Sequence, residues 1–151
     1  MNQPFKLLLI GDSDSQLLAC EALCRFPSER TVQVTINAIP RKGTPEAILT
    51  RAAALGELWR LDMGQLLTHP KLRQFDAIGV YLTGSKISGF RLALGLLPSR
   101  ERPLLFCGFN GVVLEKFIEG ISWRLGYDLV CLSGPRDREA LDRMLEGSPF
   151  A

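Results

Sequence analysis

Six short apolar runs occur along the chain, and longer amphipathic stretches separate them. The runs are Phe5–Ile10, Thr31–Ala38, Leu58–Leu61, Ala77–Leu82, Leu104–Cys107 and Leu129–Leu132. Several are continuous rather than alternating, which is typical of strands that are covered on both faces of a sheet. The third run is the weakest signal, because its residues could equally extend a helix. The pattern predicts about six strands, most of them buried.

Residues that start and stop helices mark the stretches between these runs. Ser13 or Asp14 can cap a helix that runs to about Phe26, and Thr44-Pro45-Glu46 opens a second helix with Pro at its first position. Three further helices are expected: from Ser85 or Ser88 to about Pro98, over Val112–Leu125, and from Pro135 to about Leu145.

Strands that alternate with helices predict parallel pairing through right-handed crossovers. We therefore expect an α/β fold, a Rossmann-like three-layer αβα sandwich whose mostly parallel sheet of about six strands has the order 3-2-1-4-5-6. Residues 1–146 should form this domain. Gly147-Ser148-Pro149 is typical of a linker, so residues 147–151 are expected to begin a linker or tail. A second domain or a homo-oligomeric partner is the corresponding expectation.

Composition and charge narrow the classes of protein that remain. The chain has 151 residues, of which 46% are hydrophobic and 23% charged, and a net charge of +2. Its basic residues are scattered and not interleaved with aromatics, so we expect no nucleic-acid partner. No apolar run approaches the roughly 20 residues of a membrane span. The first residues also lack the features of a signal peptide, which predicts a cytoplasmic protein.

The cysteines and the histidine do not predict a metal site or another cofactor. The four cysteines form no CxxC pair, and His69 is the one histidine in the chain. Small buried side chains in a reducing compartment are the favoured interpretation of the cysteines. Trp59 and Trp123 are expected to pack against the core, with sugar stacking as the alternative.

Small polar residues and glycines follow the predicted strands. Ligands bind at the carboxyl ends of parallel strands, where glycines let a ligand approach the backbone and helix N-termini present N–H groups. The expected ligand-binding residues are therefore Gly11, Ser13, Thr83, Gly84, Ser85, Gly108, Asn110, Gly111 and Ser133. The structural alternative is that loops between strands and helices need glycine and capping residues whatever they bind.

Several familiar motifs are absent from the sequence. There is no GxGxxG after the first strand, no GxxxxGK[ST] and no GxSxG, which argues against dinucleotide-binding, P-loop and hydrolase-elbow sites. A receiver domain is disfavoured as well, because no clear phosphoacceptor Asp follows the third strand.

Asp12-Ser13-Asp14-Ser15 resembles the DxDx[TV] signature of haloacid-dehalogenase-type phosphatases. In that family the first Asp attacks phosphorus, the second is the general acid/base, and magnesium offsets their charge. Val80–Thr83 is similar to the family's second motif, and Lys86 or Lys116 could stand for its lysine. The sequence departs from the family because a glycine precedes Asp12 and no acidic pair follows a late strand. Helix capping and first-turn acids are the structural alternative for Asp12 and Asp14.

A second resemblance covers the whole chain. It is similar to the N-terminal domain of two-domain, GT-B-type glycosyltransferases, especially poorly characterised ones of bacteria. The residues that carry the likeness are Lys6–Ser15, Phe75–Ser85, Arg102–Gly111, Trp123–Ser133 and Asp137–Glu139.

The glycosyltransferase resemblance implies sugar transfer from a nucleotide sugar to an acceptor small molecule or glycan. The N-terminal domain of such enzymes supplies the acceptor side and often a catalytic base, and Asp12 is the candidate for that base. The donor nucleotide is held mainly by a C-terminal domain, so the isolated domain is expected to be inactive. Three hypotheses remain open: this glycosyltransferase domain, a non-catalytic module that binds a nucleotide or small ligand, and a phosphatase that uses Asp12 and Asp14.

Overall fold

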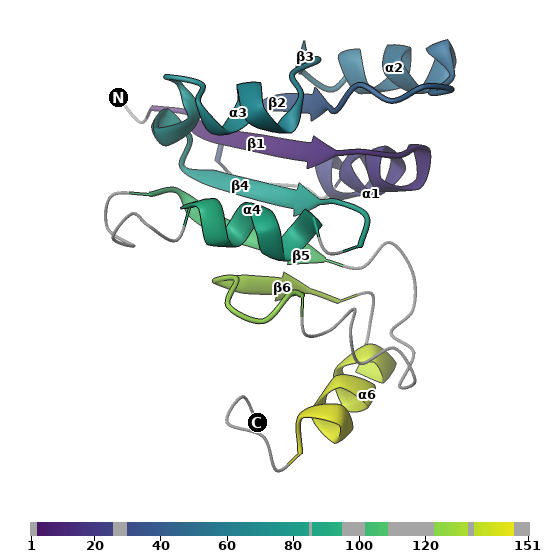
Figure 1. Cartoon of the computed structure of the whole chain (residues 1–151), viewed down its shortest axis with the longest axis vertical. Helices are drawn as coiled ribbons and strands as arrows, with labels where there is room; N and C mark the ends of the chain where they lie inside the picture. Colours follow the sequence, from purple (N-terminus) through teal and green to yellow (C-terminus); the bar gives the residue numbers. More distant parts are fainter. Residues whose placement is uncertain are drawn as a thin grey trace.

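The chain folds around one parallel sheet. The structure, a computed structural model, describes residues 3–25, 30–84, 86–94, 102–108, 123–132 and 135–146. Six strands occur in these ranges, every neighbouring pair is parallel, and their order is β3-β2-β1-β4-β5-β6 (Figure 1). Their bounds are β1 Phe5–Gly11, β2 Val32–Ala38, β3 Glu57–Trp59, β4 Ala77–Tyr81, β5 Leu104–Gly108 and β6 Leu129–Cys131. The predicted Rossmann-like α/β fold and its strand order are confirmed.

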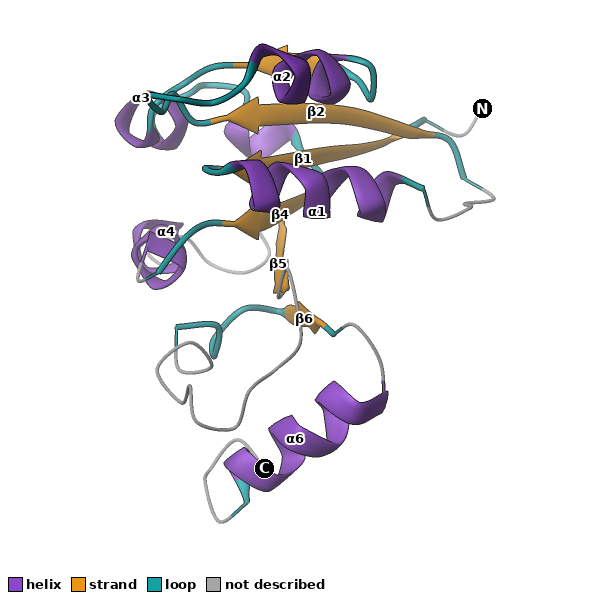
Figure 2. Ribbon diagram, turned by 90° about the vertical axis from the view of Figure 1, so that its right-hand side faces the viewer, coloured by secondary structure: helices purple, strands orange, loops and turns teal. Residues whose placement is uncertain are grey.

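Helices connect the strands and lie on both faces of the sheet. They are α1 Asp14–Cys24, α2 Glu46–Ala53, α3 Met63–Leu67, the 3-10 helix η1 Leu72–Gln74, α4 Lys86–Leu94 and α6 Pro135–Leu145. Figure 2 looks onto the face that α1 covers, and in both views α6 lies beyond β6 at the end of the sheet. Among the described residues, no helix combines the length and the apolar composition that crossing a bilayer requires.

Two hydrophobic clusters separate the layers of the sandwich. On one face, Leu9 and Ile36 pack with Leu17 and Cys20 of α1 and Ala52 of α2. On the other face a larger cluster joins strands β1, β4 and β5 to α3, η1 and α4; its helical members are Leu66, Leu72, Ile87, Phe90 and Leu94. The burial of these apolar side chains is the main contribution to the stability of the fold.

Strand β2 is not a continuous apolar run, because valine, isoleucine and alanine alternate with glutamine, threonine and asparagine along it. Its side chains alternate: Ile36 and Ala38 join the α1 face, whereas Thr35 and Asn37 point to the opposite face. Asn37 is fully buried, and its amide exchanges two hydrogen bonds of 3.1 Å with the backbone of Leu61. Because a buried amide is costly unless it is hydrogen-bonded, this contact explains how an asparagine can be buried here. It also fixes the connection from β3 to α3.

The helix boundaries show which of the predicted capping residues form capping hydrogen bonds. Ser13, one of the two predicted capping residues, caps α1. Its hydroxyl accepts a hydrogen bond from the N–H of Gln16. In α2, Pro45 is the N-cap and not the first helical residue, so the prediction is wrong by one position; no side chain caps this helix, and the Thr44 hydroxyl donates to the carbonyl of Arg41.

Helix α3 was not predicted, although a complete capping box of Asp62 and Gln65 marks it. Its five residues are too few for a helical hydrophobic pattern to stand out. The predicted helix over Val112–Leu125 lies outside the described residues, except for its last three positions, and so do Phe26 and Pro98, where two other helices were expected to end.

Candidate functional site

The candidate site lies where the strand order reverses, beside β1 at the carboxyl edge of the sheet. The chain leaves β1 for α1 on one face and leaves β4 for α4 on the other, which opens a crevice between the two connections. The loop after β2 also reaches this edge, because the N–H of Ile39 donates to the carbonyl of Gly11 over 3.0 Å. Three loops therefore meet at one place.

Asp12 follows β1 directly and is the central polar group of this crevice. Its side chain is buried, with 6% of the residue exposed. The N–H of Thr83 donates to both carboxylate oxygens, over 3.1 and 3.0 Å, and the Thr83 hydroxyl donates to Oδ1 over 2.8 Å. Hydrogen bonds to a carboxylate are stronger than neutral ones, so these contacts compensate for the loss of water around Asp12.

Lys86, in the first turn of α4, is the second residue that contacts the Asp12 carboxylate. Its ammonium lies 3.4 Å from Oδ2, while 62% of the lysine side chain remains exposed. Gly84 lies between Thr83 and this helix and has a φ of +65°, a left-handed conformation that residues other than glycine rarely adopt. The turn at Gly84 thus brings the Thr83 backbone and Lys86 to the same carboxylate.

Two adjoining cavities open at this edge and share Arg41. The first has a volume of about 310 Å³ and is lined by Asp12, Ile39, Pro40, Arg41, Thr83 and Lys86. The second has a volume of about 320 Å³ and is lined by Ser13, Asp14, Ser15, Arg41, Lys42, Gly43 and Thr44. Ligand pockets commonly measure about 300–1,000 Å³. We call the two cavities together the edge cleft.

The loop after β2, residues 39–45, was not among the predicted site residues. It supplies Arg41 and Lys42 to the edge cleft, where Lys86 adds a third cation. The signal for it in the sequence was the Arg41-Lys42 pair directly after an apolar run. Three cations beside Asp12 and Asp14 give the cleft groups that suit the phosphates and the hydroxyls of a ligand.

The predicted site residues divide into three sets. Asp12, Ser13 and Thr83 line the edge cleft, and Gly84 makes the turn beside it. Gly11 is a packing position, since a side chain there would begin 2.8 Å from Cδ2 of Leu17 in α1. Ser85, Asn110, Gly111 and Ser133 lie outside the described residues.

Gly108, at the end of β5, lines neither cavity of the edge cleft. A Cβ at this position would lie 3.0 Å from the Tyr81 hydroxyl, and the Gly108 carbonyl accepts a hydrogen bond of 3.1 Å from Nε of Arg124. Burial lowers the pKa of the Arg124 guanidinium from its ordinary value. Gly108 and Arg124 therefore hold the end of β5 and the turn before β6 together.

Asp14 does not share the cavity of Asp12. It begins α1 and lines the second cavity with Lys42, whereas Asp12 lines the first. Within the described ranges, no group of three or more His, Cys, Asp or Glu side chains is placed to hold a metal ion. The carboxylates and hydroxyls of the edge cleft can exchange protons and hydrogen bonds with a ligand. Its cations can compensate the charge of an anion.

A family of proteins shares the pattern of this sequence. The model of the family described as "Putative glycosyltransferase (DUF6716)" matches residues 7–150. The chain belongs to this family. The matched residues include the strand β1–Asp12 junction, the loop after β2 and the Thr83–Lys86 segment, so all the described parts of the edge cleft lie inside the family region. The glycosyltransferase-like assignment is thereby confirmed at the level of the family.

Comparisons with individual proteins say less about function than the family model does. No curated protein matches the sequence. Two solved structures of glucose dehydrogenase from Haloferax mediterranei, one of them in complex with NADP, Zn and gluconolactone, match with TM-scores of 0.49 and identities of 11% and 12%. Each match covers 99% of this chain but 43% and 42% of the dehydrogenase, so the chain spans less than half the length of those proteins.

Proposed function

We propose that this chain is the acceptor-side domain of a GT-B-type glycosyltransferase that uses a nucleotide sugar and acts in the cytoplasm. The observation that carries the proposal is the Asp12 carboxylate, which is held by Thr83 in a cleft that also contains Arg41 and Lys86. Membership in the glycosyltransferase-like family supports it. The edge cleft is the expected place for the acceptor.

In the proposed reaction Asp12 is the general base. The hydroxyl oxygen of the acceptor forms a bond to the anomeric carbon of the donor sugar, and the bond from that carbon to the phosphate oxygen breaks. The hydroxyl proton passes to Asp12, and the nucleoside diphosphate leaves with the bonding electrons. A base must lie within about 3 Å of the proton that it accepts.

Lys86 marks the position at which the acceptor hydroxyl would approach. Oδ1 of Asp12 receives both Thr83 donors, whereas Oδ2 is shared between the Thr83 N–H and the 3.4 Å contact with Lys86. Because Lys86 is long and largely exposed, its ammonium can move aside at little cost. An acceptor hydroxyl can then hydrogen-bond to Oδ2 while Lys86 turns to the departing phosphate.

The test is nucleoside diphosphate release from a panel of nucleotide sugars, measured with the full-length protein and mixed sugar acceptors. We expect Asp12→Asn to lower the rate about 10²- to 10⁴-fold, the usual contribution of a general base. Asp14→Asn is the matched control, because Asp14 lines the neighbouring cavity, and it should keep most of the activity.

Melting temperatures of both variants show whether each one folds. If Asp12→Asn does not fold, Thr83→Val replaces it, since this change removes a hydroxyl from the carboxylate and keeps the shape of the side chain. Release that is equally fast with Asp12→Asn and the unaltered protein would refute the role of Asp12.

A phosphatase is the second candidate, and one observation favours it. Thr83 and Lys86 both contact Asp12, as the second motif and the lysine of haloacid-dehalogenase-type enzymes require. In that mechanism Asp14 is the acid/base, so Asp14→Asn should abolish magnesium-dependent release of inorganic phosphate together with Asp12→Asn. Loss of activity in Asp12→Asn alone separates the glycosyltransferase from this alternative.

A further inference from the structure

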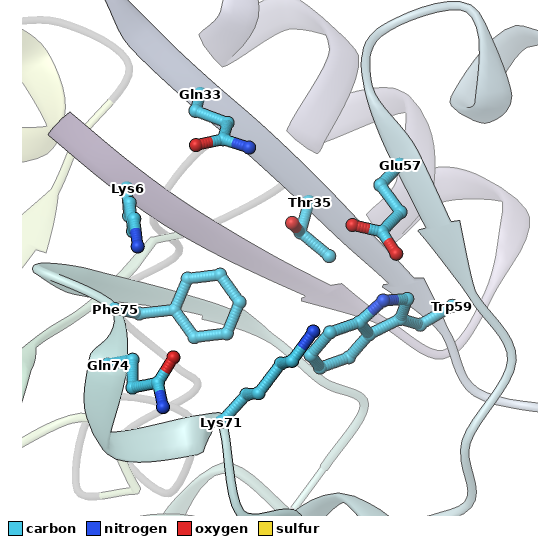
Figure 3. A pocket seen from close by; sticks show the side chains of 8 residues that line it. All are labelled: Lys6, Gln33, Thr35, Glu57, Trp59, Lys71, Gln74 and Phe75. Carbon is cyan, nitrogen blue, oxygen red and sulfur yellow. The ribbon is translucent and has the colours of Figure 1, made fainter. Parts of the chain in front are cut away.

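A second pocket lies on a face of the sheet, away from the edge cleft, and shares no lining residue with it. Its volume is about 130 Å³, and Figure 3 shows the side chains that surround it. Strands β1, β2 and β3 supply one side and the segment around η1 supplies the other. The lining residues are Lys6, Gln33, Thr35, Glu57, Trp59, Lys71, Gln74 and Phe75. We call this the face pocket.

Thr35 is the observation that points to a ligand. Its residue is only 5% exposed, and its side chain lies at the centre of the face pocket in Figure 3. No described residue hydrogen-bonds to its hydroxyl, although valine would fill the same volume on a β-strand. Every fully buried side-chain oxygen or nitrogen among the described residues has a hydrogen-bond partner, so the Thr35 hydroxyl is not sealed in the core but opens into the pocket, where an entering molecule can bond to it.

The other polar groups of the face pocket are also free to bind. Lys6, Glu57 and Lys71 form no ion pair with any described residue, and Gln33 and Gln74 make no side-chain hydrogen bond there. Ammonium groups only donate, a carboxylate only accepts, and hydroxyls and amides do both. A ligand that pairs with all of these groups must donate hydrogen bonds at some of its edge atoms and accept them at others.

Two aromatic rings give the pocket a firm apolar wall. Trp59 is held between His69, at a ring distance of 4.5 Å, and Phe75, at 5.7 Å in an edge-to-face arrangement. Both belong to the margin of the large hydrophobic cluster, so the core fixes their positions. Figure 3 shows the Phe75 ring face-on, with Thr35, Lys71 and Gln74 around it.

We infer that the face pocket binds one sugar ring, with a C–H face of the pyranose on the Phe75 ring, Trp59 beside it, and its hydroxyls on the surrounding polar groups. Every sugar hydroxyl both donates and accepts, which fits this mixture of lysines, amides, a hydroxyl and a carboxylate. The volume of about 130 Å³ lies below the usual range of about 300–1,000 Å³ for ligand pockets, which limits the ligand to about one ring and excludes a whole nucleotide sugar. This site is separate from the edge cleft and does not depend on the proposed reaction there.

The test is a titration of the 151-residue chain, followed by NMR of the tryptophan indole N–H signals. The chain has two tryptophans, so Trp59 reports the face pocket and Trp123 is an internal control. Neutral aldohexoses and N-acetylhexosamines are the probes, and a small open pocket predicts a dissociation constant in the millimolar range. We expect a saturable shift of the Trp59 signal while the Trp123 signal stays in place.

Thr35→Val is the decisive variant, because it removes only the hydroxyl. We expect binding to weaken about fivefold, which is the usual loss for one neutral hydrogen bond. Thr50→Val, the same change on the exposed surface of α2, should leave the dissociation constant unaltered. Asp12→Asn should leave it unaltered too, which keeps this result independent of the edge cleft.

Three results would overturn the inference. One is the absence of a saturable Trp59 shift with every sugar. Another is saturation by glycine, alanine or adenosine while the sugars have no effect, which would assign the pocket to an amino acid or a nucleobase. The third is unchanged sugar affinity in Thr35→Val.

Discussion

Asp12 is a single side chain that joins two loops 71 residues apart in the sequence. Its carboxylate receives the N–H and the hydroxyl of Thr83, so it holds the β1 and β4 connections together at the point where the strand order reverses. The same contacts hold the carboxylate in a fixed orientation towards the cleft. Structure and proposed chemistry therefore depend on one residue, which is why the functional test includes a measurement of folding.

The cysteines give a residue-scale prediction about reactivity. Burial raises the pKa of Cys20 well above its usual range and raises the pKa of Cys107 to about 12; it also raises the pKa of Cys131, but Cys131 is exposed to a reagent. The thiolate is the reactive form, so neither buried cysteine should react in the folded protein. In an iodoacetamide time course analysed by peptide mass spectrometry, we expect Cys131 to be labelled first and Cys20 and Cys107 only in denaturant.

Labelling of Cys107 as fast as that of Cys131 in the folded protein would contradict the packing of β5. Full labelling of all four cysteines in denaturant is the control that each peptide can be detected.

At the scale of elements, β4 shows how two faces of a sheet are packed. All five of its residues are buried, and Gly79 lies at its centre between the two neighbouring strands. A Cβ at Gly79 would lie 2.5 Å from Cζ of Phe106 and 2.7 Å from Cδ2 of Leu9. The absence of a side chain therefore allows the Phe106 ring to cross the strand, which is a packing requirement and not a need for special backbone angles.

One substitution at two glycines should have opposite effects on stability. Gly79→Ala overpacks the core and should lower the free energy of unfolding by about 1–3 kcal/mol. Gly89→Ala, in α4, meets nothing within 4 Å and replaces a poor helix former, so it should raise the free energy by about 0.5–1 kcal/mol. Chemical denaturation of both variants measures the difference. Equal effects of the two changes would show that Gly79 is not tightly packed.

At the scale of the whole molecule, the β6 side of the sheet depends on polar contacts between distant segments. The Arg102 guanidinium donates to both oxygens of Asp128 over 2.7 and 3.0 Å, and the N–H of Leu105 donates to the same carboxylate over 2.8 Å. The Tyr127 hydroxyl also donates to the carbonyl of Ile87 in α4 over 2.6 Å. These bonds attach the segment before β6 to β5 and α4 where β6 itself is short.

The Arg102–Asp128 pair predicts how stability changes with pH. The hydrogen bonds from Arg102 hold the pKa of the Asp128 carboxyl below its ordinary value. A carboxyl whose pKa is lower in the folded protein stabilises the fold above its ordinary pKa and loses that effect as the pH falls through the folded value. We expect Asp128→Asn to cost about 1–3 kcal/mol at pH 7, and the difference from the unaltered protein to shrink below about pH 4.

Asp142→Asn is the control for the pH series. Asp142 pairs with Arg138 on the surface of α6, and 61% of its side chain is exposed, so its removal should change stability by less than about 0.5 kcal/mol. Urea denaturation at several pH values compares the two. A difference for Asp128→Asn that stays constant from pH 7 to pH 3 would contradict the role of this ion pair.

The sequence by itself determined the strands, their parallel order and the edge at which polar loops gather. These features follow from local patterns: apolar runs of strand length, capping residues such as Ser13, and the right-handed crossover that leaves few topologies. Asp12 and Thr83 could be assigned to the same edge for the same reason. The short α3 gave too little pattern, and Gly108, predicted to follow a strand, is the last residue of β5 and packs against Tyr81 instead of lining the edge cleft.

Only the tertiary structure decided which of these residues meet. The Asp12–Thr83–Lys86 contacts, the approach of Arg41 and the face pocket around Thr35 all join segments that are distant in the chain. No local pattern encodes such contacts, because they depend on how helices and loops close over the sheet.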